Sequence, residues 1–290
     1  MKRAIAIGNF DGFHLGHQQI VHVLKEISRK DNIPAAIITF SPNPKIYFKK
    51  EHNFISTDKQ KRQMLESLGV EEIIFQNFEE ISHYSGEKFI QHYLIDRLQM
   101  AHLIVGENFK FGKNRKTDLL SIHNMAHQFG FCLNSVKPVL LDGVRISSTL
   151  VREKLKKGSI LEANRMLGKS YYIDGWVIEG EKIGREMGFP TINLRTANTI
   201  LPEGVFETMT QVGAKQFKSI TNIGYRPTFC GNDIKVETHI LNFDKNIYGE
   251  NVRVFFEDKI RNEIKFETRE QLIFQISKDM ESLFKIDIIQ

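Results

Sequence analysis

The sequence predicts two domains of different class: an α/β domain with a mostly parallel sheet, followed by a small antiparallel β-barrel with a C-terminal helix. In the first half, short β-branched runs alternate with amphipathic stretches, which is the pattern of βαβ units. In the second half, short strand candidates follow one another between Gly, Pro and Asn turns, and one amphipathic stretch closes the chain. A chain of 290 residues is long enough for two ordinary domains.

The strand candidates of the first half are 3–8, 35–40, 72–75, 101–105 and 131–136, and the helix candidates are 15–30, 59–68, 86–98 and 118–129. This alternation indicates a sheet with helices on both faces. Ligands of such sheets bind at the carboxyl ends of the strands. We therefore expect the loops after Gly8, Phe40 and Val105 to be functional.

Two more helices are expected, over 147–157 and 159–167, and Gly168 stands where a helix stop is typical. The predicted domains are accordingly 1–168 and 169–290. Strands of the second domain are predicted at 172–179, 191–194, 204–210, 217–223, 235–241 and 251–259. A final helix over 269–284 should pack on the barrel through Leu272, Ile276, Met280 and Leu283.

Composition narrows the class of protein. The chain is 41% hydrophobic and 26% charged, a balance typical of soluble globular proteins. The apolar run after Met1-Lys2-Arg3 is too short for a signal peptide or a membrane span, and the two cysteines form no disulfide or zinc pattern, so a cytoplasmic location without membrane contact is expected. The net charge of +5 suits phosphorylated ligands, and no motif indicates nucleic acid or an oligomeric state.

The first strand runs into a glycine turn that leads to two histidines at a helix start. The segment reads Gly8-Asn9-Phe10-Asp11-Gly12-Phe13-His14-Leu15-Gly16-His17. Spacing by three puts both imidazoles on one helix face, and free N–H groups at a helix N-terminus favour anions. A chance pair of histidines or half of a metal site is the alternative, but the strand-turn-helix context favours a phosphate site. Gly8, Asn9, Phe10, Asp11 and Gly16 are the expected phosphate-binding residues beside the histidines.

Two later segments of the first domain carry similar signals. Ser147-Ser148-Thr149 opens a helix that also carries Arg152, so that hydroxyls, N–H groups and a guanidinium can meet phosphate; an ordinary helix cap with a surface arginine is the alternative. Asn108, Phe109 and Phe111 follow a strand in Gly106-Glu107-Asn108-Phe109-Lys110-Phe111-Gly112. The two rings can stack on a planar ligand, or they can be packing residues.

The second domain has a glycine-punctuated segment before a strand. Gly180, Gly184 and Arg185 precede Gly188-Phe189-Pro190-Thr191-Ile192-Asn193. Thr191 and Asn193 alternate on the strand, so their oxygens point the same way and can hold Mg²⁺. A β-turn followed by a polar strand edge explains the same spacing.

Together these motifs resemble the bacterial bifunctional riboflavin kinase/FAD synthetase family. The first domain resembles it in His14-Leu15-Gly16-His17, in the segment from Gly106 and in Ile146-Ser147-Ser148-Thr149-Leu150-Val151-Arg152. The second resembles it in Gly188–Asn193, Asn222–Phe229 and Val236–Phe243. The resemblance covers essentially the whole chain. It implies a nucleotidylyltransferase-type, Rossmann-like domain and a riboflavin kinase barrel.

The resemblance also implies roles. ATP and Mg²⁺ would serve two reactions, in which riboflavin is phosphorylated to FMN and FMN is then adenylylated to FAD. His14, His17 and Arg152 would stabilise charge during adenylylation, while Asn43, Asn108, Phe109 and Phe111 would contact the flavin. In the kinase half, Glu237 would be the general base, Thr191 and Asn193 would hold Mg²⁺, and Arg226 would contact flavin or be structural.

Two departures from the family pattern motivate alternatives. Asn43 stands in Ser41-Pro42-Asn43-Pro44, where the family has histidine, and Ile192 stands where alanine is usual. The first departure suggests a riboflavin kinase with an impaired adenylyltransferase domain as the alternative. A flavin-binding regulatory protein is the rival from another class, but mere binding would not require a base together with Mg²⁺ ligands.

Overall fold

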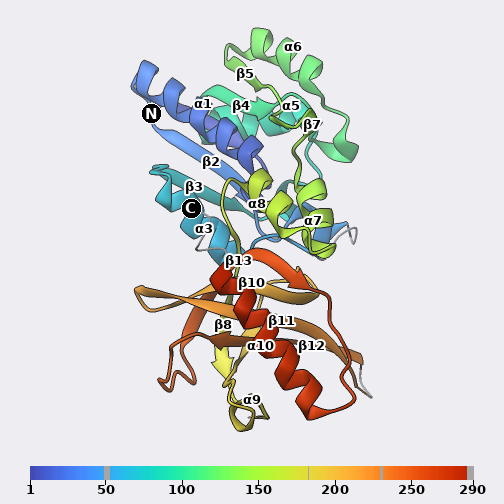
Figure 1. The fold of residues 1–290 in the computed structure, drawn as a ribbon. Helices are drawn as coiled ribbons and strands as arrows, with labels where there is room; N and C mark the ends of the chain where they lie inside the picture. The colour runs from blue at the N-terminus through green and yellow to red at the C-terminus, as the bar shows by residue number, and fades with distance from the viewer. Residues whose placement is uncertain (49–52, 182, 229–230, 286–290) are drawn as a thin grey trace. The chain divides into compact units, whose positions relative to one another are not determined.

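The computed structural model describes residues 1–48, 53–181, 183–228 and 231–285. Contacts divide the chain into two compact units, Met1–Ser148 and Thr149–Gln290, which are described separately. Figure 1 shows a sheet with helices in the first unit and a barrel in the second. This confirms the predicted fold class.

The first unit is built on a five-stranded parallel sheet with the order β3-β2-β1-β4-β5. Its strands are β1 (Arg3–Ile7), β2 (Ala35–Phe40), β3 (Glu72–Gln76), β4 (Met100–Gly106) and β5 (Cys132–Val136). Its longer helices are α1 (Leu15–Asp31), α3 (Asp58–Ser67), the π-helical η1 (Phe89–Arg97) and α6 (Leu119–Phe129). Shorter elements are α2 (Pro44–Tyr47), α4 (Phe78–Ile81), α5 (Gly86–Lys88), η2 (Lys113–Arg115), β6 (Leu140–Leu141) and β7 (Val144–Arg145).

Both faces of this sheet are buried, because its strands carry apolar residues at successive positions. On β1, Ala4 and Ala6 belong to the core formed with α1 and α3, whereas Ile5 and Ile7 belong to the core formed with η1 and α6. The small alanines let α1 approach closely.

The strand order reverses between β1 and β4, so the loops after these two strands flank the topological switch point where ligands of open α/β sheets bind.

The second unit is a closed antiparallel barrel with the order β10-β11-β12-β9-β8-β13. Its strands are β8 (Tyr171–Ile178), β9 (Ile192–Thr196), β10 (Gly204–Val212), β11 (Lys215–Thr228), β12 (Gly231–Ile240) and β13 (Asn251–Arg261). The helices are α8 (Ile160–Leu167), α9 (Ile183–Glu186), α10 (Arg269–Lys285) and α7 (Ser148–Lys156), which begins at the last residue of the first unit.

Contacts group α8 with the barrel. Asn164 on α8 donates to the Phe256 carbonyl at 2.8 Å and accepts from the Tyr171 amide at 2.7 Å. These bonds tie the helix to β13 and β8. The division of contacts therefore falls earlier in the chain than the boundary predicted at residue 168, which remains a prediction.

Strand alternation sorts the barrel residues into an inner and an outer set. Thr208, Ser219, Thr221 and Thr238 point inward, are fully buried, and form hydrogen bonds of 2.8–2.9 Å with one another. These bonds satisfy the buried hydroxyls. The neighbouring positions on β11 and β12 consequently face outward, where they form the wall of a cavity.

Candidate active sites

The loop after β1 is held in a strained shape by a buried carboxylate. Phe10 and Phe13 have φ of 47° and 50°, which non-glycine residues rarely adopt. The Asp11 Oδ1 atom accepts from the backbone amides of Ile55 and Ser56 at 2.9 and 3.2 Å. The Gly12 amide donates to the Ser56 hydroxyl at 3.1 Å. The structure thus gives Asp11 an anchoring role, and such strain is common at functional sites.

The two histidines of the first motif stack on each other. The His14 and His17 ring centroids are 3.8 Å apart, and His14 is the residue that starts α1. A side chain at position 16 would place its Cβ atom 3.1 Å from His14 Cε1, so Gly16 makes room for the stack. Both Nδ1 atoms are buried and lack a hydrogen-bond partner among the described residues. Unpaired buried nitrogens of this kind are typical of a site that is completed by a ligand.

Burial keeps both imidazoles neutral near pH 7. It lowers the pKa of His14 to about 4, and it lowers the pKa of His17 well below the usual range, helped by electrostatic repulsion that protonated His17 would meet from Lys61 and from His14. A neutral imidazole has one N–H donor and one acceptor nitrogen. Each ring can therefore donate one hydrogen bond to a phosphate oxygen.

The other predicted residues of this loop lie around the stack. The Asn9 carbonyl accepts from the Thr39 hydroxyl at 3.2 Å, and its Oδ1 atom is buried without a partner in the described chain. The Gly8 amide donates to the Ile38 carbonyl at 3.1 Å. The Phe10 ring is fully buried, with its centroid 5.3 Å from that of His17. The Phe10 ring is therefore a packing group, and contact of this residue with ATP remains a prediction.

A hydrogen bond joins the two predicted phosphate motifs. The Ser148 hydroxyl donates to the Asp11 carbonyl at 3.1 Å, across 137 positions of sequence. Ser147 is half-buried and Thr149 is exposed. Arg152 is buried on α7 and belongs to the second of the two compact units. Its contact with ATP remains a prediction.

A cavity of about 210 Å³ lies beside this loop and contains a buried ammonium that sequence reasoning missed. Its walls include Asp11, Asn43, Ser56, Asp58 and Lys61. Lys61 is 3% exposed and lies 3.5 Å from the Asp58 carboxylate, while Asn43 accepts from the Lys45 amide at 3.1 Å and caps α2. Helical spacing from Lys61 to buried Leu65 was a signal that could have identified this lysine.

The aromatic loop after β4 packs on the unit's own core. Phe109 and Phe111 have ring centroids 5.4 Å apart, and Phe111 lies the same distance from Phe89. Both side chains remain half-buried, whereas Asn108 is exposed. Packing is thus part of their role, and flavin contact remains a prediction.

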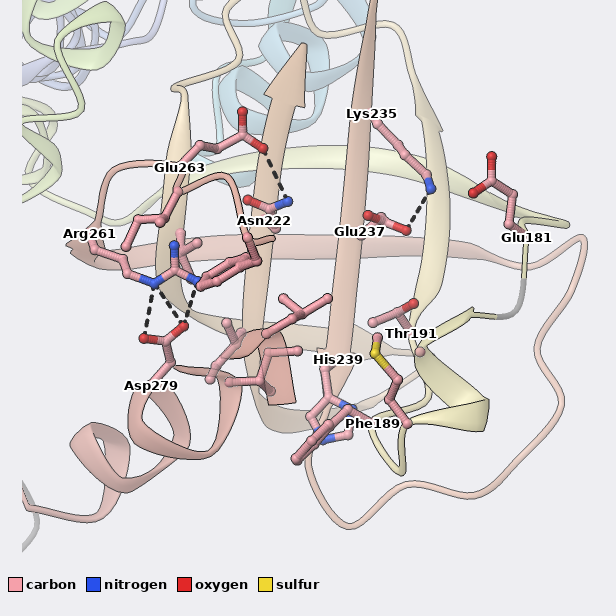
Figure 2. Close-up of a pocket in the computed structure, with 18 residues that line it drawn as sticks. Glu181, Phe189, Thr191, Asn222, Lys235, Glu237, His239, Arg261, Glu263 and Asp279 are labelled. Atoms are coloured by element: carbon pink, nitrogen blue, oxygen red, sulfur yellow. Dashed lines mark hydrogen bonds and ion pairs between the residues drawn. The ribbon is translucent and has the colours of Figure 1, made fainter. Parts of the chain in front are cut away.

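In the barrel unit, a cavity of about 300 Å³ lies between the outer wall of the barrel, the segment before β9, and α10 (Figure 2). Register places Asn193 on β9 opposite Glu237 on β12, which in turn is opposite Asn222 on β11. Residues paired across strands share a face, so these three side chains point the same way. Thr191 also lines the cavity. The structure thereby brings together the predicted base and the predicted metal ligands.

Glu237 is half-buried and forms an ion pair with Lys235, whose Nζ atom lies 2.8 Å from its Oε1 atom (Figure 2). The Asn222 Nδ2 atom donates to Glu263 at 3.4 Å, and its Oδ1 atom is buried without a partner among the described residues. Lys235, Asn222 and Glu263 were not among the predicted site residues. The two-residue spacing between Lys235 and Glu237 was the available signal for the lysine.

The glycine segment packs directly against Thr191 and Asn193, the predicted metal ligands. A Cβ atom at Gly180 would lie 2.6 Å from Asn193 Cγ, and one at Gly184 would lie 2.5 Å from the Phe189 carbonyl oxygen. Arg185 is exposed on α9. The His239 Nδ1 atom lies 2.7 Å from the Pro190 carbonyl, which fixes the segment before β9 against β12.

Helix α10 forms the opposite wall of the cavity. Leu272 and Ile276 of the predicted stripe line it. The Arg261 Nε atom lies 2.9 Å from Asp279 Oδ2, which joins β13 to the helix (Figure 2). The side chains of Leu283 and Arg226, both named from the sequence, lie outside the described part of the structure.

Comparison with known proteins matches two family models to successive parts of the chain. A family model described as FAD synthetase matches residues 1–150, and one described as riboflavin kinase matches residues 167–286. The bifunctional riboflavin kinase/FMN adenylyltransferase of Haemophilus influenzae is 37% identical over 284 residues, covering 96% of this chain and 92% of that protein. The chain belongs to this family. The resemblance seen in its motifs is therefore confirmed.

Other known proteins are also similar over nearly the whole chain. The enzyme of the same description from Escherichia coli strain K12 is 33% identical and covers 95% of this chain and 90% of that protein. A solved structure titled a macrolide-efflux protein from Streptococcus pneumoniae is 28% identical, with a TM-score of 0.88, and covers 97% of this chain and 93% of that one. In the part of the chain that the structure describes, no helix is long and apolar enough to cross a bilayer.

Proposed function

We propose that this chain phosphorylates riboflavin to FMN in the barrel cavity and adenylylates FMN to FAD at the loop of His14 and His17, with ATP as the second substrate of each reaction. The observation that carries the proposal is the register of Asn193, Glu237 and Asn222 across three strands beside Thr191. Glu237 and Thr191 line the cavity and Asn193 lies opposite Glu237 on the neighbouring strand, which supports a base and oxygen ligands placed side by side.

In the kinase reaction, Glu237 accepts the proton of the riboflavin 5′-hydroxyl. The hydroxyl oxygen attacks the γ-phosphorus of ATP, the bond from that phosphorus to the β-γ bridging oxygen breaks, and ADP leaves. Asn193 stands opposite Glu237, so the ATP phosphates and the hydroxyl meet over β9 and β12. Gly180 and Gly184 let their segment pack closely against Asn193 and Thr191, beside which the phosphates would bind.

The donors near Glu237 fit Mg²⁺. The described residues contain no group of three or more His, Cys, Asp or Glu side chains that could hold a metal alone. Mg²⁺ on ATP keeps several waters and takes few protein ligands, all of them oxygens. Thr191 and Asn193 provide such oxygens, and Mg²⁺ bound there would neutralise phosphate charge.

In the adenylyltransferase reaction, a phosphate oxygen of FMN attacks the α-phosphorus of ATP and pyrophosphate leaves. No enzyme nucleophile is required. Neutral His14 and His17 donate hydrogen bonds to phosphate oxygens, and Ser148, tied to Asp11, positions the second motif. Arg152 would add positive charge where negative charge develops.

Two separate assays test the proposal. Riboflavin with ATP and Mg²⁺ should yield FMN and ADP, and FMN with ATP and Mg²⁺ should yield FAD and pyrophosphate in equal amounts. Formation of FMN without any FAD would favour the kinase-only alternative, motivated by Asn43. Failure of both reactions in a folded protein would refute the proposal.

A further inference from the structure

Lys235 lies beside the proposed base of the kinase reaction. It precedes Glu237 by two residues on β12, so both side chains emerge on the outer face of the barrel. Its Nζ atom lies 2.8 Å from the Glu237 Oε1 atom, and the two side chains are 24% and 28% exposed (Figure 2). The ammonium is thus held inside the cavity, next to the group that must receive a proton.

Carboxylates outnumber lysine and arginine side chains among the described residues that line the cavity. The described lining residues include the carboxylates of Glu181, Glu237, Glu263 and Asp279, against the cations Lys235 and Arg261. The Arg261 Nε and terminal nitrogens lie 2.9 and 2.8 Å from Asp279 Oδ2, and another of its nitrogens donates to the Asn262 carbonyl at 3.0 Å. Arg261 is therefore committed to α10. Lys235 is the lining cation placed to meet the negative charge of a triphosphate.

The position of the reacting phosphorus follows from the position of the base. A general base must come within hydrogen-bond distance of the hydroxyl that it deprotonates, and the oxygen of that hydroxyl attacks the γ-phosphorus. A cation bonded to the same carboxylate consequently lies within one phosphate's width of the transferred group. An ammonium has three N–H donors, so one bond to Glu237 leaves two for other oxygens.

We propose that Lys235 is a catalytic residue of the kinase reaction, whose ammonium donates to a γ-phosphoryl oxygen of ATP while it remains beside Glu237. The inference rests on the kinase function proposed above. During transfer, the hydroxyl proton passes to Glu237 and its carboxylate loses its negative charge. The ammonium then has its strongest electrostatic interaction with the phosphoryl oxygens, where it stabilises the transition state.

A merely structural lysine would hold Glu237 in place without touching ATP. A non-hydrolysable ATP analogue and ADP together separate the two roles, because only the analogue carries a γ-phosphoryl group. Inhibition of FMN formation by either nucleotide, competitive with ATP, reports the barrel site alone even though the chain also binds ATP at its first site. If Lys235 contacts the γ-phosphoryl group, Lys235→Met raises the Ki of the analogue and leaves the Ki of ADP unchanged, whereas loss of a merely structural lysine leaves both Ki values unchanged.

The test compares Lys235→Met, Lys235→Arg and the control Lys215→Met in the full-length chain. Lys215 is an exposed lysine of the same barrel, on β11, and does not line the cavity. For Lys235→Met we expect kcat of FMN formation to fall about 100-fold, with a raised Ki for the ATP analogue and an unchanged Ki for ADP. Lys235→Arg should recover about tenfold or more of this loss because it keeps the charge. Lys215→Met should behave as wild type.

Some results would overturn the role of Lys235, and a different result would refute the kinase function on which it rests. A kcat of Lys235→Met within about threefold of wild type would overturn the proposal, and so would an unchanged Ki of the ATP analogue or an equal rise in the Ki values of the analogue and ADP. Absence of FMN formation by the wild-type protein would instead refute the underlying kinase function. If Lys235→Met no longer bound ADP at all, Lys235→Gln would be measured by the same criteria, and Trp176 fluorescence would report whether its barrel is folded.

Discussion

Replacement of Gly180 by alanine tests whether the position of Asn193 controls the kinase reaction. The added Cβ atom would lie 2.0 Å from Asn193 Nδ2 and 2.6 Å from Asn193 Cγ, whereas non-bonded heavy atoms pack at about 3.5 Å. The amide must therefore move by at least about 1 Å, since it is buried and cannot simply swing into solvent. A displacement of this size at a catalytic group costs about 100-fold in rate.

The assay is FMN formation from riboflavin and ATP by Gly180→Ala, with FAD formation from FMN as an internal measure of the first unit. Gly213→Ala is the control, because Gly213 has a φ of +60° and no atom within 4 Å of the position of its missing Cβ. The control should lose roughly 1–2 kcal/mol of stability but no kinase rate. A wild-type rate for Gly180→Ala would refute the role given to Asn193.

Three further predictions follow from the described contacts. Glu237→Gln should lower kcat of FMN formation by about 10²–10⁴-fold and leave FAD formation from FMN unchanged; equal loss of both would contradict separate sites. The pKa of His14 is about 4 in the folded chain, below its ordinary 6.5, so the unfolded chain binds more protons and stability falls as pH drops through this window. From pH 7 to pH 5 the contribution of His14 to this loss should be about 2 kcal/mol, so hydrogen exchange of β1 should show a loss smaller by about that amount in His14→Gln than in wild type. Asp11→Ala removes two hydrogen bonds to a buried carboxylate and should lower the unfolding free energy of the first unit by about 2–4 kcal/mol in urea; an unchanged value would exclude the anchoring role.

The fold could be predicted because its periodicities are strong. The helix expected over 118–129 is α6 at Leu119–Phe129, and the strand expected over 251–259 is β13 at Asn251–Arg261. Short elements were missed where local patterns are weak. The helix α2 exists because Asn43 caps it and Pro44 begins it, in a stretch too short for periodicity to register.

The site was predictable only where residues lie near each other in sequence. The spacing of Thr191 and Asn193 placed both on one face, but no local pattern joins them to Glu237, because that pairing depends on the register of β9 with β12. The ion pair of Lys235 with Glu237 likewise appears only once the strand faces the cavity. The hydrogen bond from Ser148 to Asp11 required the folded chain to bring distant loops together.

The most direct test of two chemistries in one chain is the fate of the ATP phosphates. The purified protein would be given riboflavin, Mg²⁺, and ATP labelled on either the γ- or the α-phosphate, and the flavins would be separated over time. The account predicts γ-label in FMN and later in FAD, and α-label in FAD alone. Flavins that carry no α-label would contradict adenylylation by this chain, and flavins without γ-label would contradict phosphorylation in the barrel.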